Sequence, residues 1–107
     1  MKSLNLGFFG ARVHFECSHE SLFLLVTIAV TTAPTGASLI VDVNKNATTI
    51  FTTQGNRPTI TAGNTEDLAS VPDVTALAQN DILTIDIDQV GSTVAGADLV
   101  VQIRCTI

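Results

Sequence analysis

Aromatic and charged residues are scarce in this chain. It has no Trp, no Tyr and only five Phe in 107 residues, and charged residues make up 14% of it, against about a quarter in an average globular protein. Exposed aromatic rings are the usual platforms for sugars and nucleic-acid bases, so their scarcity argues against such sites. The net charge of −5 and the five scattered basic residues argue against a nucleic-acid partner or an anionic membrane surface.

Signatures of catalysis and metal binding are also missing. The chain contains no G-x-S-x-G nucleophile motif and no Gly-rich phosphate loop followed by a helix. The stretch DVNKN at 42–46 has the spacing of a calcium loop, but Ala47 and Thr53 stand where an EF-hand needs Gly and Glu. A metal-like run of His and Glu at 14–20 is expected to continue from a strand into a turn. We therefore expect no enzymatic activity, no catalytic residues, no cofactor and no metal site.

Two cysteines and one apolar run bear on the compartment. Cys17 and Cys105 match no zinc or C-x-x-C pattern. They could meet as a disulfide if the first and last strands are neighbours, but we favour two buried thiols because nothing else indicates an oxidising compartment. The apolar run at 22–30 is shorter than the roughly 20 residues that span a bilayer, and the acidic residues before it do not suit a signal peptide. We interpret it as a buried strand.

Thr, Val and Ile are abundant instead, and these β-branched residues favour strands. Turn residues at 33–36, 44–47 and 80–81 separate short stretches of alternating or continuous apolar residues. Residues 63–72 are predicted to be a mobile polar loop, and residues 73–78 a helical turn or a short strand. Strands are predicted at residues 12–17, 22–30, 38–43, 48–53, 59–62, 82–89 and 99–107.

This spacing of strands and turns predicts an all-β fold, an antiparallel, jelly-roll-like β-sandwich of about eight short strands. Residues 1–11 are predicted to be an N-terminal arm or edge segment, and residues 12–107 a single sandwich domain. Phe8 and Phe9, which glycines flank, suit either an arm that docks on a neighbouring molecule or a first strand that packs into the chain's own core.

The stretch ILTIDIDQ at 82–89 raises the question of a paired-carboxylate site. Alternation places Asp86 and Asp88, together with Thr84, on one face, and the aliphatic Leu83, Ile85 and Ile87 on the other. A hairpin with residues 99–107, joined by the loop 91–98, would put Asp86 opposite Arg104 and Asp88 opposite Gln102. We therefore interpret the two carboxylates as part of a solvent-facing sheet surface and not as a catalytic or metal-binding pair.

Three stretches carry a resemblance to a known kind of protein: TAPTGASLIVDVNKN at 32–46, IFTTQGNRPTI at 50–60, and PDVTALAQNDILTIDIDQVGSTVAGADLVVQIR at 72–104. Together they resemble a β-rich module of structural proteins in the virions of tailed bacteriophages, of the tail-fibre or minor structural protein type. Such modules carry Gly where this chain has Ala47 and Asn80. The resemblance implies a sandwich-like virion component and supplies no catalytic residues.

We therefore expect a non-enzymatic virion protein that is assembled in the host cytoplasm. It would bind other virion subunits, as a capsid decoration (cement) protein or a compact tail or fibre module, and form a homo-oligomer, with a trimer favoured. The alternative is a host-glycan-binding fibre tip. The residues expected to contact partners are Phe8, Phe9, Asn64, Thr65, Glu66, Asp67, Ser92, Thr93 and Val94.

Overall fold

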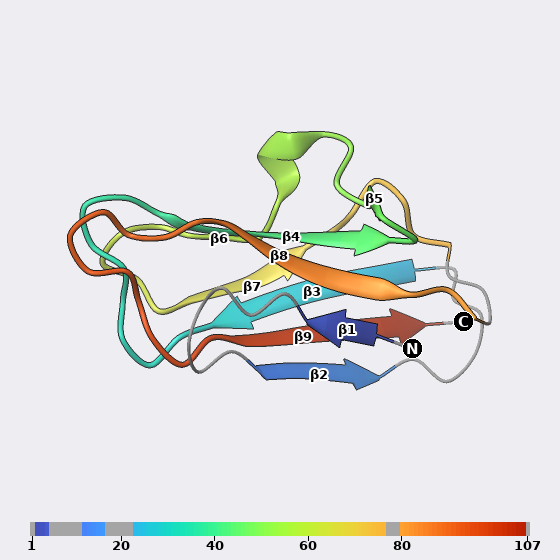
Figure 1. Ribbon diagram of the computed structural model, residues 1–107, viewed down its shortest axis with the longest axis horizontal. Helices are drawn as coiled ribbons and strands as arrows, with labels where there is room; N and C mark the ends of the chain where they lie inside the picture. The colour runs from blue at the N-terminus through green and yellow to red at the C-terminus, as the bar shows by residue number, and fades with distance from the viewer. Residues whose placement is uncertain (1, 5–11, 17–22, 77–79, 107) are drawn as a thin grey trace.

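The computed structural model describes residues 2–4, 12–16, 23–76 and 80–106, which form two β-sheets packed face to face (Figure 1). The first sheet has the strand order β1-β8-β4-β5, with β6 also paired to β4, and the second has the order β2-β9-β3-β7. The strands are β1 (Lys2–Leu4), β2 (Arg12–Glu16), β3 (Phe23–Ala29), β4 (Leu39–Lys45), β5 (Thr48–Thr49), β6 (Thr59–Ile60), β7 (Glu66–Ser70), β8 (Leu83–Gln89) and β9 (Val100–Thr106).

The predicted all-β sandwich is confirmed, with nine strands among the described residues where about eight were expected. The pairs β1/β8 and β2/β9 are parallel, and the other strand pairs described are antiparallel. Residues 2–4 are therefore an edge strand of the first sheet, whereas the division at residue 11 and the jelly-roll detail stay predictions.

The predicted hairpin between residues 82–89 and 99–107 is wrong. Strand β8 pairs with β4 in one sheet and β9 pairs with β3 in the other, so residues 90–99 cross between the two layers. Residues 30–38, which connect β3 to β4, make the same crossing beside them, through bridges of Thr32 to Ala97 and Thr35 to Val94. Adjacency in sequence favours a hairpin, but pairing with β3 and β4 lets each strand bury its apolar face between the sheets.

The core lies between the sheets and follows the period of two that a strand imposes. The alternation predicted for residues 82–89 is confirmed in β8, where Leu83 and Ile85 are buried, and β4 follows the same period, with Leu39, Val41 and Val43 fully buried. Strand β3 is an inner strand of its sheet, as its apolar run predicted. The other buried hydrophobic residues of the core are Val26, Ile28, Val30, Ile50, Phe51, Ile60, Leu99, Val101 and Ile103.

Two local predictions need correction. Residues 63–72 are not a loop, because residues 66–70 form β7 on the edge of the second sheet. Their polar side chains hid this strand, since an edge strand needs few apolar residues. The return strand predicted at 48–53 is only two residues long, because the chain leaves the sheet after Thr49 and turns through a short 3₁₀ helix at Gln54–Asn56.

The turns lie where Asn, Pro and Gly residues predicted them. The two-residue β4–β5 hairpin places Asn46 and Ala47 at φ values of 53° and 73°, as a type I′ turn requires. Asn80 and Gly36 also have positive φ, at 74° and 85°. Residues 73–76 form no strand, and 77–79 lie outside the described part of the chain. Among the described residues, no helix has the length and hydrophobicity needed to cross a membrane.

Candidate functional site

One end of the sandwich carries three segments without a single charged residue: 31–37, 61–65 and 90–97. We call this surface the charge-free end. It includes the two crossings between the sheets and the turn from β6 to β7, at the left of Figure 1. Residues far apart in the sequence thus form one surface, and its position is set by the strands on either side.

Backbone hydrogen bonds hold the two crossings together. Thr35 N–H donates to the Val94 carbonyl at 2.9 Å, and Thr93 N–H donates back to the Thr35 carbonyl at 2.9 Å. One step further along, Ala97 N–H donates to Thr32 at 3.2 Å, and Thr31 N–H donates to Ala97 at 3.1 Å. The crossings therefore behave as a continuation of the antiparallel ladders on both sides, which fixes their shape.

The third segment is tied to the first crossing. Gly63 N–H donates to the Pro34 carbonyl at 2.8 Å, and Val30 N–H donates to the Thr65 carbonyl at 2.8 Å. These bonds close the end around the buried Pro34. The three segments thus form one hydrogen-bonded unit.

Two glycines allow the crossings to approach this closely. A Cβ on Gly91 would overlap the Val94 carbonyl and lie 2.8 Å from both the backbone N and the carbonyl O of Thr35. Gly36, at φ 85°, already faces the backbone N of Thr93, which a Cβ would meet at 2.9 Å. At Gly91 the contact is between backbones, whereas a Cβ at Gly36 would first meet the side-chain hydroxyls of Ser92 and Thr93. A methyl group at either glycine would therefore require the crossings to shift.

The surface of this end is made of short polar and small aliphatic side chains. The exposed fraction is 37% for Val90 and 41% for Val94. The acidic Glu66 and Asp98 directly follow two of the three segments, and Asp98 accepts a hydrogen bond from Thr31 Oγ1 at 2.7 Å. The exposed members of the three segments are Thr31, Thr32, Gly36, Thr61, Ala62, Gly63, Asn64, Thr65, Val90, Ser92, Thr93 and Val94.

The structure brings together most of the residues predicted to contact partners. Asn64 and Thr65 lie at the same end as the group Ser92, Thr93 and Val94, although they were assigned to separate loops. Glu66 and Asp67 instead begin β7. Asp67 is partly buried and accepts hydrogen bonds from Thr59 N–H at 2.8 Å and from Ser70 Oγ at 3.0 Å. Phe8 and Phe9 lie outside the described residues.

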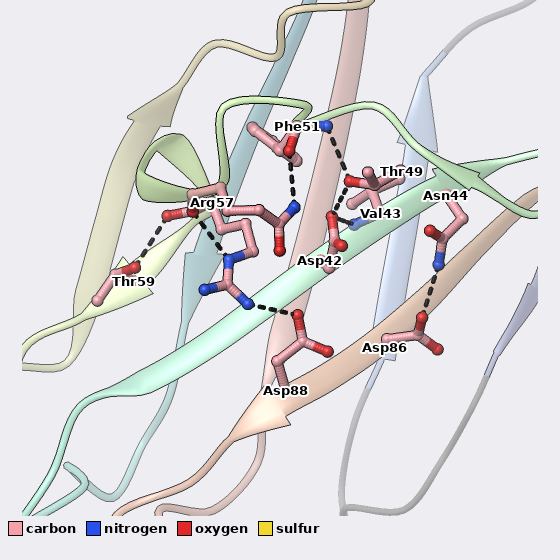
Figure 2. Close-up of polar contacts among 10 residues, drawn as sticks. Asp42, Val43, Asn44, Thr49, Phe51, Arg57, Thr59, Asp86 and Asp88 are labelled. Carbon is pink, nitrogen blue, oxygen red and sulfur yellow. Dashed lines mark hydrogen bonds and ion pairs between the residues drawn. The ribbon is translucent and has the colours of Figure 1, made fainter.

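The outer face of the first sheet holds the carboxylates that prompted the question of catalysis (Figure 2). Asp86 accepts a hydrogen bond from Asn44 Nδ2 at 2.6 Å, and Asp88 pairs with Arg57 at 2.8 Å. The predicted register of Asp86 against Arg104 is wrong, because their strands belong to different sheets. Their assignment to the outward face is confirmed, since Leu83 and Ile85 on the other face of β8 are buried and Ile87, between the two carboxylates, packs partly buried against the core.

Sequence reasoning missed a third carboxylate on this face. Asp42 is only 7% exposed and is the register partner of Asp86 on the neighbouring strand. Its Oδ1 accepts hydrogen bonds from Val43 N–H at 2.8 Å and from Thr49 Oγ1 at 2.7 Å. Along this edge of β4, no described strand pairs with the residues between those that face β6 and those that face β5, and the hydrogen bonds of Asp42 occupy that gap. The role of Asp42 is therefore structural.

The two metal-like stretches of the sequence, 42–46 and 14–20, give no metal cluster among the described residues. Residues 42–46 belong to β4 and its turn, and not to a helix-flanked loop of the EF-hand type. No group of three or more potential metal ligands occurs among the described residues. His14 and Glu16 lie on β2, but 17–22 are outside the described part, as are the side chains of both cysteines.

Comparisons with models of known protein families, with curated proteins and with solved structures found no match. The charge-free end is the arrangement from which a function can be argued, because it joins predicted contact residues into one exposed surface.

Proposed function

We propose that this chain is a non-enzymatic structural protein of a tailed-bacteriophage virion. It binds other virion subunits through the charge-free end, as a capsid decoration protein or a compact tail or fibre module. The gathering of segments 31–37, 61–65 and 90–97 at one rigid end is the observation that carries the binding role. The resemblance of residues 32–46, 50–60 and 72–104 to virion modules supports the biological setting.

Three properties of the end suit protein binding. Interface cores are depleted in charge, and this end has none across its three segments. Exposed aliphatic groups at Val90 and Val94 gain free energy when they are buried. Backbone hydrogen bonds fix the segments before any partner arrives, which lowers the entropy lost on association.

The polar groups on the first sheet do not suit catalysis. The Asp88 carboxylate is bound to Arg57, and Asp42 is satisfied by Val43 and Thr49. A pair of catalytic carboxylates would need two environments that separate their proton affinities around a substrate, whereas these groups bind to their own neighbours.

Incorporation into particles tests the proposal. In the phage whose genome encodes the chain, a copy carrying Val94→Glu would compete with the parent chain during assembly. We expect mass spectrometry of purified particles to find the parent and to find Val94→Glu strongly depleted, because a buried unpaired carboxylate opposes binding. The matched control is Ile82→Glu, which we expect to be incorporated like the parent. Ile82 is an exposed aliphatic residue, 53% against 41% for Val94, and it lies just before β8, at the end of that strand away from the charge-free end.

Absence of the parent chain from purified particles would contradict a virion role. Equal incorporation of the Val94 and Ile82 variants would show that the charge-free end is not the binding surface. A glycan array separates the proposal from a receptor-binding tip. Sugar binding that is lost on Val94→Glu and retained on Ile82→Glu would favour the tip.

A further inference from the structure

We infer that Cys17 and Cys105 form an intramolecular disulfide that links the edge strand β2 to its neighbour β9 in the second sheet. The sequence alone made such a bond conditional on the two cysteine-bearing parts of the chain being neighbours. Strand β2, which ends one residue before Cys17, pairs with β9, which contains Cys105. Cys17 lies outside the described residues, so the inference rests on the backbone that flanks it.

The register of β2 and β9 runs up to the two cysteines. The strands are parallel, and their last paired residues are Glu16 and Arg104. The next residue after each is a cysteine, Cys17 after the first and Cys105 after the second. One further step of the same register would place the two Cα atoms about 4.8 Å apart, the spacing of neighbouring strands. Disulfides span Cα distances of about 4.4–6.8 Å, a range that includes this separation.

The chain is also held beside the end of β9 from its other side. Strand β3 pairs with the opposite edge of β9, and its first residue, Phe23, lies opposite Thr106. The residues that flank the segment 17–22 are therefore both positioned by the last residues of β9. Consecutive Cα atoms are about 3.8 Å apart, so Cys17 lies within one such step of Glu16. Described residues thus limit where Cys17 can be.

Formation of the bond needs an oxidant, and oxidised glutathione supplies it by thiol–disulfide exchange. One cysteine thiolate attacks the glutathione disulfide and releases a glutathione thiolate, and the second cysteine then attacks the mixed disulfide and releases the other. The bond between the two cysteines forms while the glutathione bond breaks. Two electrons pass to glutathione, and the two thiol protons leave with its released thiolates. Only one intramolecular disulfide is possible, because the chain has two cysteines.

The bond would stabilise the fold and respond to the compartment. It closes the loop from residue 17 to residue 105, and cross-links that close long loops restrict the unfolded chain most. Thiols stay reduced in the cytoplasm, whereas disulfides persist on virion surfaces. A virion protein would therefore acquire the bond after release from the host. This timing rests on the proposed function, whereas the bond itself does not.

Peptide mapping of the purified full chain tests the inference. The chain is equilibrated with oxidised glutathione under native conditions, its remaining thiols are blocked, and it is digested with trypsin without reduction. Trypsin cleaves after Arg12, Lys45 and Arg104, so we expect peptide 13–45 joined to peptide 105–107. The intact oxidised chain should be lighter than the reduced chain by two hydrogen atoms. Free or glutathione-bound cysteines, or a bond between two chains, would overturn the inference.

A displaced cysteine tests the register. The control variant carries Cys17→Ser together with Glu16→Cys, which moves the thiol by one residue. Successive side chains of a strand point to opposite faces, and thiols that point apart cannot be bridged without backbone movement. At the same ratio of reduced to oxidised glutathione, we expect this variant to form the bond with Cys105 about tenfold less than the parent. Equal bonding in both chains would contradict the register on which the inference rests.

Thermal melts measure the effect of the bond on stability. The oxidised parent should melt roughly 10 °C or more above the reduced parent. Cys17→Ser cannot form the bond and should melt at the same temperature in both conditions, and the comparison within each chain removes any direct effect of serine. An oxidised parent that melts no higher than the reduced parent would overturn the stabilising role of the bond.

Discussion

Asp42 shows how one buried carboxylate substitutes for a missing strand. The outer edge of β4 is paired at its two ends, by β6 at Leu39 and Ile40 and by β5 at Asn44 and Lys45. Between them, the Asp42 carboxylate accepts the Val43 N–H that a continuous strand would otherwise bond. Its position opposite Asp86 brings two like charges together, an unfavourable arrangement that the hydrogen bonds of both groups offset.

Replacement of Asp42 measures this role. Asp42→Ala should lower the free energy of unfolding by about 1–3 kcal/mol, because it leaves buried donors without an acceptor. Asp42→Asn keeps an oxygen that can accept from Val43 and Thr49 and removes the like charge opposite Asp86, so it should cost much less. Urea denaturation of both variants distinguishes these results, and an equal loss for Ala and Asn would show that the negative charge itself matters.

The ion pair between Arg57 and Asp88 should contribute little by comparison. Both side chains are partly exposed, and pairs of this kind contribute about 0.2–1 kcal/mol. We expect Asp88→Asn to lower the free energy of unfolding by no more than that amount, and by less at high salt. A loss well above 1 kcal/mol in urea denaturation would show that the pair anchors the 3₁₀ segment more strongly than its exposure implies.

At the scale of the element, the turn of the β4–β5 hairpin contains one residue in a strained backbone conformation. Ala47 has φ 73°, where an L residue with a Cβ costs roughly 1–2 kcal/mol relative to the right-handed region. Asn46 tolerates this conformation better because its side chain also bonds to Asp81 and accepts the Ile82 N–H. The sequence marked this turn correctly, since Asn next to a small residue favours a type I′ geometry.

Ala47→Gly should therefore stabilise the chain. We expect a gain of about 0.5–1 kcal/mol in the free energy of unfolding, because relief of strain exceeds the greater entropy of Gly in the unfolded chain. Thermal and urea denaturation would both detect this gain. A loss of stability in the variant would contradict the positive φ assigned to Ala47.

The crossing between the sheets is the second element whose stability can be tested. A methyl group at Gly91 would overlap the backbone at Val94 and Thr35, whereas one at Gly55, in the 3₁₀ turn, would meet no atom within 4 Å. Gly91→Ala should lower the free energy of unfolding by about 1–3 kcal/mol or more, and Gly55→Ala should change it by less than about 0.5 kcal/mol. Similar effects of the two substitutions in urea denaturation would show that the crossings are not in close contact.

At the scale of the whole molecule, local patterns predicted the strands better than their partners. Alternation identified the inward face of β8, and Asn, Pro and Gly identified the turns. The pattern could not show that β8 and β9 lie in different sheets, because a loop of the length of 91–98 can close a hairpin or cross between layers. That choice depends on which pairing buries most apolar surface across the whole chain.

The charge-free end was only partly predictable for the same reason. The two polar loops that supplied Asn64 and Val94 were identified as candidate contact surfaces, but their meeting around Pro34 required the paired crossings. A signal was nevertheless present in the sequence, because 31–37, 61–65 and 90–97 are each free of charge and rich in Thr, Ser, Gly and Ala.

The shape of the molecule makes the ends of the sandwich natural contact surfaces. The principal extents are 40 × 23 × 20 Å, so the strands run along the long direction and the charge-free end lies at one tip (Figure 1). An elongated module that binds through its tip projects its remaining surface away from the partner. This arrangement suits a protein that decorates or extends a larger assembly.

An electron-microscopy map of the phage particle that we propose contains the chain is the most direct test of the binding role at this end. We expect density for the two-sheet sandwich in the particle, with residues 31–37, 61–65 and 90–97 buried against another subunit and residues around Ile82 outside that contact. A particle map that contains the sandwich with this end facing solvent would contradict the role proposed for it.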